Sequence, residues 1–376
     1  MLHVLHYTRD FPPTAASGLS VLVERATRAL LPGITSTVLS FDAWRPRGGD
    51  VPAPGAPPVE EHPREGVRVV RLRTARDHDS LAESWPTRPA DVVQVHDPLL
   101  YSAARSVADR HGLPLVYTVH TLHAHQNVLR ELDHTLSAHA EAKAMRAATC
   151  IHVLSEACAG RVLEYHPFVS PRLRLAPAGV DRPLLAPSRD PGDLVFVGRF
   201  SDLKGIDTLL HALGPLWQGH PEARLTLIGG LPENANAERR WRRRLLAIAE
   251  SWPGTRMTFL GWQDADTVRA RLARAAGVIA PSRFETFGQV AIETLAAQVP
   301  LVASRTGRVV DLAPLLSGRA SLVTPDDQPE LTRAIADLLD RGGARSDVLT
   351  EPLLDAIAWE RRITDWAHLL RDVATT

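Results

Sequence analysis

The sequence predicts an α/β protein made of two doubly wound, parallel-sheet domains in tandem. The chain has 376 residues, which is more than one hydrophobic core usually organises. Short β-branched apolar runs alternate with helical patterns, as is typical of βαβ units. A stretch with prolines at 177, 183, 187 and 191 interrupts the alternation, which then starts again. We therefore expect two Rossmann-like domains, residues 1–185 and 186–357, that face each other across a cleft.

The apolar runs define the expected strands of each sheet. Those of the first domain lie at 2–7, 37–41, 67–72, 92–96 and 115–119, and those of the second at 194–197, 224–229, 257–260, 277–280 and 300–303. A first helix is expected at about 19–31, where apolar residues recur at helical spacing. Ligands of such sheets bind beyond the carboxyl ends of the strands, so we expect the functional residues in the loops that follow them.

For two segments the sequence predicts local structure but no function. Residues 46–66 contain six prolines and are expected to form an extended surface excursion rather than a packed element. The two cysteines, Cys150 and Cys158, fall in a stretch whose pattern indicates a helix followed by a strand. Their number and spacing suit neither a disulfide framework nor a zinc site.

The charge balance excludes a global attraction to polyanions. Lys plus Arg and Asp plus Glu both total 43, so we expect no nucleic-acid partner and no general membrane association. The apolar run at the start is too short for a signal sequence, and a cytoplasmic location is expected. Five arginines surround Trp241 in the segment 238–246. This segment could lie on an anionic surface, but a solvated helix face is the favoured interpretation.

The first cluster of candidate chemistry lies at residues 197–213. A predicted strand ends at Gly198, and a polar loop then brings Arg199 and Lys204 to the start of a helix near Asp207. Two cations at a helix N-terminus suit a diphosphate that gains negative charge as a bond breaks. Only two of the 43 basic residues are lysine, at 143 and 204, so Lys204 is expected to have a chemical role.

The second cluster lies at residues 281–296. Glu285 is expected on a strand-to-helix loop, and Glu293 about two turns further along. The backbone amides of Thr286, Phe287 and Gly288 can hold a phosphate or a sugar hydroxyl at the start of the helix. A carboxylate such as that of Glu293 can accept both hydrogen bonds of a ribose diol.

These clusters resemble the donor-binding domain of the GT4 family of retaining glycosyltransferases, whose hallmark is two glutamates separated by seven residues. Glu285 and Glu293 match that motif, and residues 299–312 resemble the family's loop beside the donor sugar. Two departures occur in the loop: Arg308 stands where a second glycine is usual after Gly307, and Asp311 where glutamate is usual. The resemblance implies a GT-B fold, catalysis without a metal, and no cofactor, because the nucleotide sugar is a co-substrate.

In the first half the resemblance is weaker. Gly18 corresponds to the second glycine of a pair that precedes the first helix, and Ser17 replaces the other. The resemblance implies that Gly18 binds the donor, with its amide reaching the phosphate. His120 corresponds to the family's strand-end histidine, which contacts the transferred sugar. Residues 175–181 resemble the phrase that crosses between the domains, with Ala178 in place of a common asparagine. The last helix, about 358–376, resembles the family's helix that packs back on the first domain and implies a hinge.

The remaining candidates concern the acceptor. Ser17, Asp97, His123 and His125 are candidates for the acceptor side of the site. Several nearby histidines raise the possibility of a metal site, but no acidic or cysteine partner follows at ligand spacing, and no metal is expected. The loops at 11–20, 42–66 and 120–135 are expected to choose the acceptor.

Together these features predict transfer of a hexose or N-acetylhexosamine, from a uridine diphosphate sugar by preference, to a hydroxyl of a small soluble acceptor. The arginine bias is typical of a GC-rich genome, which suggests specialised metabolism such as antibiotic biosynthesis. Three alternatives stay open: transfer to a membrane glycolipid, a nucleotide-sugar epimerase or sugar phosphorylase, and a catalytically silent sugar-nucleotide-binding partner subunit. The sequence does not predict the oligomeric state.

Overall fold

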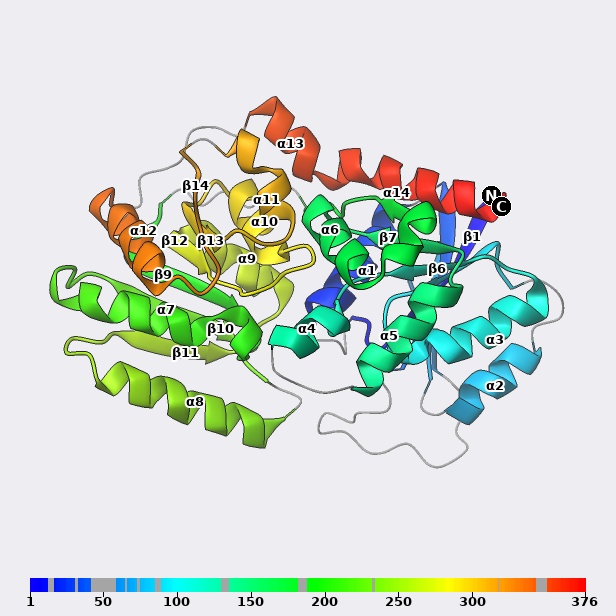
Figure 1. The fold of residues 1–376 in the computed structure, drawn as a ribbon, viewed down its shortest axis with the longest axis horizontal. Helices are drawn as coiled ribbons and strands as arrows, with labels where there is room; N and C mark the ends of the chain where they lie inside the picture. Colours follow the sequence, from blue (N-terminus) through cyan, green and yellow to red (C-terminus); the bar gives the residue numbers. More distant parts are fainter. Residues whose placement is uncertain are drawn as a thin grey trace. The chain divides into compact units, whose positions relative to one another are not determined.

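The computed structural model describes two compact units (Figure 1). The first consists of Met1–Ala178 with Trp359–Thr376, and the second of Gly179–Ala358. The described residues are those of the whole chain except 13–16, 31–32, 42–58, 65, 73–74, 85–88, 130–134, 182–187, 232–233, 317 and 343–349. The last helix, in red in Figure 1, thus belongs to the first unit, although it follows the second in sequence.

The first unit is built on an eight-stranded sheet in the order β3-β4-β2-β1-β5-β6-β7-β8. The strands are β1 (Leu2–Thr8), β2 (Ile34–Ser40), β3 (Val59–Arg64), β4 (Val67–Arg71), β5 (Val92–Val95), β6 (Leu115–Thr118), β7 (Cys150–Val153) and β8 (Leu173–Leu175). β3 pairs antiparallel with β4, whereas the other pairs are parallel. The central strands are almost entirely buried because helices cover both faces of such a sheet.

The helices of the first unit follow or connect these strands, except α14, which comes after the second unit in sequence. They are α1 (Gly18–Ala29), α2 (Ala75–Ser84), α3 (Tyr101–His111), α4 (His123–Leu129), α5 (Leu136–Ala147), α6 (Glu156–Tyr165) and α14 (Trp359–Ala374), with short 3₁₀ helices η2 (Pro98–Leu100) and η3 (Pro167–Arg172). α14 packs against α1 and β5. Its Trp366 is fully buried, and the indole meets the ring of His152 edge-on, with 4.7 Å between the ring centroids.

The second unit has a six-stranded parallel sheet in the order β11-β10-β9-β12-β13-β14. The strands are β9 (Asp190–Gly198), β10 (Arg224–Gly229), β11 (Met257–Gly261), β12 (Ala275–Ala280), β13 (Leu301–Ser304) and β14 (Ala320–Val323). The helices are α7 (Ile206–Leu213), α8 (Ala235–Glu250), α9 (Ala265–Arg274), α10 (Gln289–Ala296), α11 (Arg308–Asp311), α12 (Gln328–Asp340) and α13 (Glu351–Ile357), with η4 (Asp202–Lys204), η5 (Gly214–Gln218) and η6 (Ala313–Leu315). Trp217, Phe196 and Phe200 are among the largest side chains of its core.

Each sheet reverses its strand order at one point, between β1 and β5 in the first unit and between β9 and β12 in the second. At such a point the loops from the two strands leave in opposite directions, and a ligand-binding crevice forms beyond the strand ends. The candidate residues predicted from the sequence mostly follow these four strands and their neighbours. The predicted fold class, two doubly wound parallel-sheet domains, is confirmed.

Two local expectations are wrong. Residues 59–64, expected to belong to a surface excursion, form β3, because the edge of β4 offers unpaired backbone groups that an extended segment can satisfy. Residues 46–58 of that excursion lie outside the described residues. Cys150 lies on β7 and Cys158 on the following α6, so the stretch is a strand followed by a helix; both side chains are buried, and they form no disulfide with each other.

Candidate functional site

In the second unit, the loops after β9 and β12 bring Lys204 and Glu285 together. Lys204 Nζ donates a hydrogen bond to Glu285 Oε1 at 2.5 Å, and Ser282 Oγ donates to the same oxygen at 2.7 Å. Gly205 makes this approach possible, because its φ is +61° and a Cβ there would lie 2.1 Å from the carbonyl oxygen of Pro281. The two strand-end loops are therefore packed directly on each other, and the lysine and the glutamate form an ion pair at the sheet's reversal point.

The loop after β13 supports Glu285 from the other side. The backbone N–H of Glu285 donates to Thr306 Oγ1 at 2.9 Å, and the N–H of Arg308 donates to the carbonyl oxygen of Phe287 at 2.8 Å. Gly307 has φ +68°, and a Cβ on it would lie 2.9 Å from both Glu285 Cβ and the Phe287 oxygen. Only glycine fits between these two loops without displacing the glutamate.

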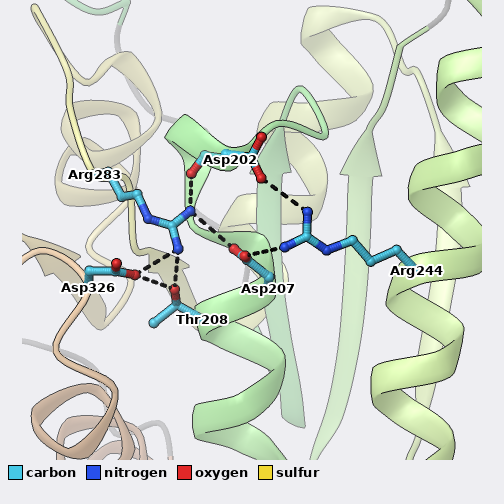
Figure 2. Close-up of polar contacts among 6 residues, drawn as sticks. All are labelled: Asp202, Asp207, Thr208, Arg244, Arg283 and Asp326. Atoms are coloured by element: carbon cyan, nitrogen blue, oxygen red, sulfur yellow. Dashed lines mark hydrogen bonds and ion pairs between the residues drawn. The ribbon is translucent and has the colours of Figure 1, made fainter. Parts of the chain in front are cut away.

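Figure 2 shows a network of polar contacts among six residues of the second unit, five of which are charged. Arg283 donates hydrogen bonds to the carbonyl oxygen of Asp202, to Asp207 Oδ1 at 3.3 Å, to Thr208 Oγ1 at 3.0 Å and to Asp326 Oδ1 at 2.7 Å. The hydrogen bond from Arg283 lowers the pKa of Asp326. Because Arg283 lies two residues before Glu285, the network fixes the β12 loop to the segment that carries Lys204.

The arginine-rich segment contributes to the same network. Arg244 on α8 donates to Asp202 Oδ1 at 3.1 Å and to Asp207 Oδ2 at 2.9 Å. The guanidinium of Arg242 pairs with Glu238 at 3.1 Å and lies over the ring of Phe259, 5.0 Å from its centroid. Arg239 donates to Asn236 Oδ1, so three of the five arginines that surround Trp241 have partners within the chain.

The other predicted donor-binding residues of the second unit lie on these loops or in the strand and helix next to them. Gly198 ends β9, and its carbonyl oxygen accepts from the N–H of Gly230 at 3.1 Å; Arg199 follows it and is exposed. Thr286 and Phe287 are buried, and Gly288, with φ +82°, precedes the first turn of α10. Glu293 on α10 accepts a hydrogen bond from Gln289 Nε2 at 3.0 Å.

The two departures in the β13 loop form a pair. Arg308 Nη1 lies 3.1 Å from Asp311 Oδ2, and their side chains are only 11% and 6% exposed. The arginine that replaces a usual glycine is therefore neutralised, within α11, by the aspartate that replaces a usual glutamate. Sequence reasoning identified both departures but not their contact.

Three predicted residues of the first unit lie next to its central elements. Ser17 and Gly18 lie at the start of α1, and Asp97 lies two residues after the end of β5. Ser17 Oγ accepts from the N–H of Ser20 at 3.1 Å and so caps α1, whose first residue is Gly18. Asp97 Oδ1 accepts from the N–H of Leu99 at 2.9 Å, and its Oδ2 lies 3.3 Å from Arg9 Nη1. Ser17 and Asp97, two of the four acceptor-side candidates, thus each accept a hydrogen bond from a backbone N–H within the protein.

The predicted histidines lie after β6 and on α4. His120 Nε2 lies 2.8 Å from His96 Nδ1, and desolvation lowers the pKa of His120 to about 3. The backbone N–H of His123 donates to Glu141 Oε2 at 2.7 Å, and the ring Nδ1 of His125 lies 2.9 Å from the hydroxyl of Tyr165. Desolvation lowers the pKa of His123 and His125 as well, so all three are neutral near pH 7.

The structure adds residues that sequence reasoning missed. Ser282, Thr306 and Arg283 hold Glu285 or its loop, and His96 contacts His120. Their only sequence signal is that each lies within a few residues of a strand end. Within the described part of the chain, no three His, Cys, Asp or Glu side chains are placed to hold a metal ion. Every described helix is too short or too polar to cross a membrane.

The sequence matches two family models and is similar to several known proteins. Residues 16–182 match the model of glycosyltransferase family 4, and residues 191–341 match that of the glycosyl transferases group 1. Glycogen synthase of Mycobacterium tuberculosis (strain ATCC 25618 / H37Rv) is 28% identical over 319 residues, which are 81% of this chain and 72% of that protein. D-inositol 3-phosphate glycosyltransferase of Mycobacterium sp. (strain KMS) is 31% identical over 280 residues, 68% of this chain and 60% of the relative.

A solved structure of Anabaena HepE in complex with UDP-glucose has the same architecture. It superimposes with a TM-score of 0.72 at 17% identity, over 100% of both chains. At that identity the likeness concerns the fold alone.

Proposed function

Because the chain belongs to the family 4 glycosyltransferases and has their GT-B fold, we propose that it transfers a hexose or an N-acetylhexosamine from a uridine diphosphate sugar to a small soluble acceptor. The acceptor atom is a hydroxyl oxygen, the anomeric configuration is retained, and no metal takes part. The family models support glycosyl transfer, and the UDP-glucose and ADP bound in solved structures of similar fold support a nucleotide-sugar donor.

The observation that carries the proposal is the Lys204–Glu285 ion pair at the reversal point of the second sheet. The two side chains are 29% and 22% exposed, so a ligand can reach both. An ammonium group there can neutralise a diphosphate, while the carboxylate beside it can accept hydrogen bonds from sugar hydroxyls. Glu293, eight residues after Glu285, supplies the carboxylate proposed to bind the ribose diol.

We propose a front-face mechanism for the transfer. The bond between the anomeric carbon and the β-phosphate oxygen breaks, and the acceptor oxygen forms its bond on the same face. The acceptor's proton passes to the departing phosphate oxygen, so no side chain needs to act as the base. Lys204 and Arg199 stabilise the charge that develops on the diphosphate, Glu285 orients the sugar, and His120 contacts it near the reacting carbon.

The preference for a small soluble acceptor rests on charge and on one relative. The chain has equal numbers of acidic and basic residues, which gives no general attraction to an anionic membrane. One relative is named for D-inositol 3-phosphate, a small soluble compound. The uridine carrier is supported by the UDP-glucose held in the structure of HepE, whose fold this chain shares.

The test combines donor binding with turnover. Calorimetric titration with UDP-, ADP- and GDP-sugars should give the tightest binding for a UDP-sugar. The protein, incubated with that donor and an extract of the source organism, should yield a product whose mass exceeds that of the acceptor by one sugar residue. The anomeric coupling constant of that product should show retention of configuration. Release of UDP should continue in EDTA.

Two variants separate nucleotide binding from chemistry. Glu293→Gln should weaken binding of UDP itself, whereas Glu285→Gln should leave UDP binding unchanged and slow turnover. Tight donor binding with neither transfer nor slow hydrolysis would instead identify a silent partner subunit and would refute the enzymatic proposal. A product found only among extracted lipids would refute the soluble acceptor.

A further inference from the structure

Three histidines of the first unit form a continuous row that ends at His120. His6 lies on β1, His96 follows β5 and His120 follows β6, and these strands are neighbours in the sheet. His120 Nε2 lies 2.8 Å from His96 Nδ1, and His96 Nε2 lies 3.1 Å from His6 Nδ1. At the far end, His6 Nε2 lies 3.2 Å from Oγ of Ser36 on β2. We call these four side chains the histidine row.

The imidazoles of the row are neutral. His6 and His96 are only 1% and 2% exposed, and desolvation lowers the pKa of His6 to about 3 and that of His96 well below its usual range. Their rings stack with 5.4 Å between centroids and an interplanar angle of 17°. A neutral imidazole has one nitrogen that carries a proton and one that does not, so it donates at one end and accepts at the other.

This property couples the tautomers along the row. If His96 donates from Nδ1 to His120, its Nε2 must accept from His6, and His6 Nε2 must then accept from Ser36. The opposite arrangement reverses every bond. Any mixture would place two protons or two lone pairs against each other at a buried contact, which is costly. The row therefore has two ordered states, and they give His120 opposite tautomers.

Ser36 selects between these states. Among the described residues, His6 Nε2 is the hydrogen-bond partner of Ser36 Oγ. A hydroxyl has one hydrogen to place, and Ser36 is 1% exposed, so its hydrogen goes to His6. Donation then runs from Ser36 through His6 and His96 to His120 Nε2. The proton of His120 must accordingly be on Nδ1.

We propose that Ser36, His6 and His96 are positioning residues that fix His120 as the Nδ1-protonated tautomer, so that it donates a hydrogen bond to an oxygen of the transferred sugar. The functional half of this inference rests on the proposed contact between His120 and that sugar. The structural half, a row of hydrogen bonds with one direction, does not. The row would favour sugars that present an oxygen at this position over deoxy analogues.

The direct test is the ¹⁵N NMR spectrum of the histidine-labelled chain at pH 7, in which protonated and bare ring nitrogens have well-separated shifts. Wild-type His120 should show a protonated Nδ1 and a bare Nε2. Ser36→Ala removes the hydroxyl that sets the direction and should turn His120 into a tautomer mixture, whereas Ser36→Thr should restore the wild-type shifts. The matched control is Thr37→Val, which removes a hydroxyl from the next residue of β2, where it contacts His3 instead.

The same variants are assayed for UDP release from UDP-glucose without acceptor. Ser36→Ala should lower kcat severalfold with little change in KM, and Thr37→Val should change neither. If the His120 shifts are identical in wild type and Ser36→Ala, the row does not set its tautomer and the inference is wrong. If the shifts change but kcat does not, the catalytic role of the row is refuted together with the contact between His120 and the sugar. UDP affinity, measured separately, tests the remainder of the proposed function.

Discussion

The two units place polar side chains at the reversal point of their own sheet but neutralise them in opposite ways. In the second unit, Lys204, Glu285 and Arg283 are charged and paired with opposite charges. In the first unit, His6, His96 and His120 are neutral and hydrogen-bonded to one another. Charged pairs can exchange partners with an anionic ligand, whereas a row of neutral imidazoles offers directed hydrogen bonds. This difference fits the proposed function, in which the second unit binds the diphosphate and the first recognises neutral oxygens.

The largest effect should come from removing the charge of the second unit's ion pair. Lys204→Ala should lower kcat by about 10²–10³-fold, the usual cost of losing one group that stabilises developing negative charge. Donor affinity should change much less, because the charge on the diphosphate grows during the reaction. Stopped-flow or steady-state release of UDP, with calorimetric titration of UDP-glucose, measures both quantities.

The chain provides a matched control for this experiment. Lys143 on α5 is its other lysine and is exposed, so Lys143→Ala should leave kcat unchanged. Weaker donor binding with kcat unchanged in Lys204→Ala would mean that Lys204 only binds the donor.

Much of the fold could be predicted because each buried parallel strand is a nearly continuous apolar run. β9 and β10 were predicted from such runs within a few residues of their ends. β7, β8 and β14 were not, because they have only three or four residues and contain polar ones such as His152 and Arg174. β3 could not be predicted either, since its proline and charges are typical of a loop and only pairing with β4 makes it a strand.

The candidate site was predictable only where residues adjacent in sequence act together. Lys204 and Glu285 were found from separate motifs, but their contact joins positions 81 residues apart and depends on two glycines, Gly205 and Gly307. The row of His6 and His96 gives no sequence signal, because each is a single polar residue in or just after an apolar run. Register between strands, which places them side by side, is a property of the folded sheet.

The neutral histidines should make the first unit sensitive to mild acid. Their usual pKa is about 6.5, whereas those of His6 and His120 are about 3 and that of His152 is about 4 in the folded chain. Below pH 6.5 the unfolded state therefore binds more protons than the folded state, and stability is lost as the pH falls. The expected loss between pH 7 and pH 6 is about 2 kcal/mol for these three groups together.

Hydrogen exchange resolves this prediction by unit. Amides of β1, β5 and β6 should lose protection between pH 7 and pH 6, after correction for the intrinsic rate, while those of β9 and β12 should not. In the second unit, the lowered pKa of Asp326 affects stability only near and below its ordinary value of 3.8. No loss of protection in the first unit would show that the histidines titrate normally, and equal losses in both units would show that the loss is not specific to the histidines; either result would remove the contrast between the units.

The smallest effect concerns how firmly the charged network holds the β12 loop. Arg283→Lys keeps the charge but replaces a planar fork by a point donor that cannot contact Asp207, Thr208 and Asp326 together. Because Glu285 lies two residues away, its orientation should loosen. The value of kcat should then fall about tenfold, which is about 1.4 kcal/mol of activation free energy, with UDP binding preserved.

The control is Arg244→Gln, which breaks contacts with the same Asp207 from a side chain that is 49% exposed. Its expected cost in stability is about 0–1 kcal/mol, with kcat unchanged. If both variants slowed turnover equally, the network would act through its net charge on the site rather than through the geometry that Arg283 imposes.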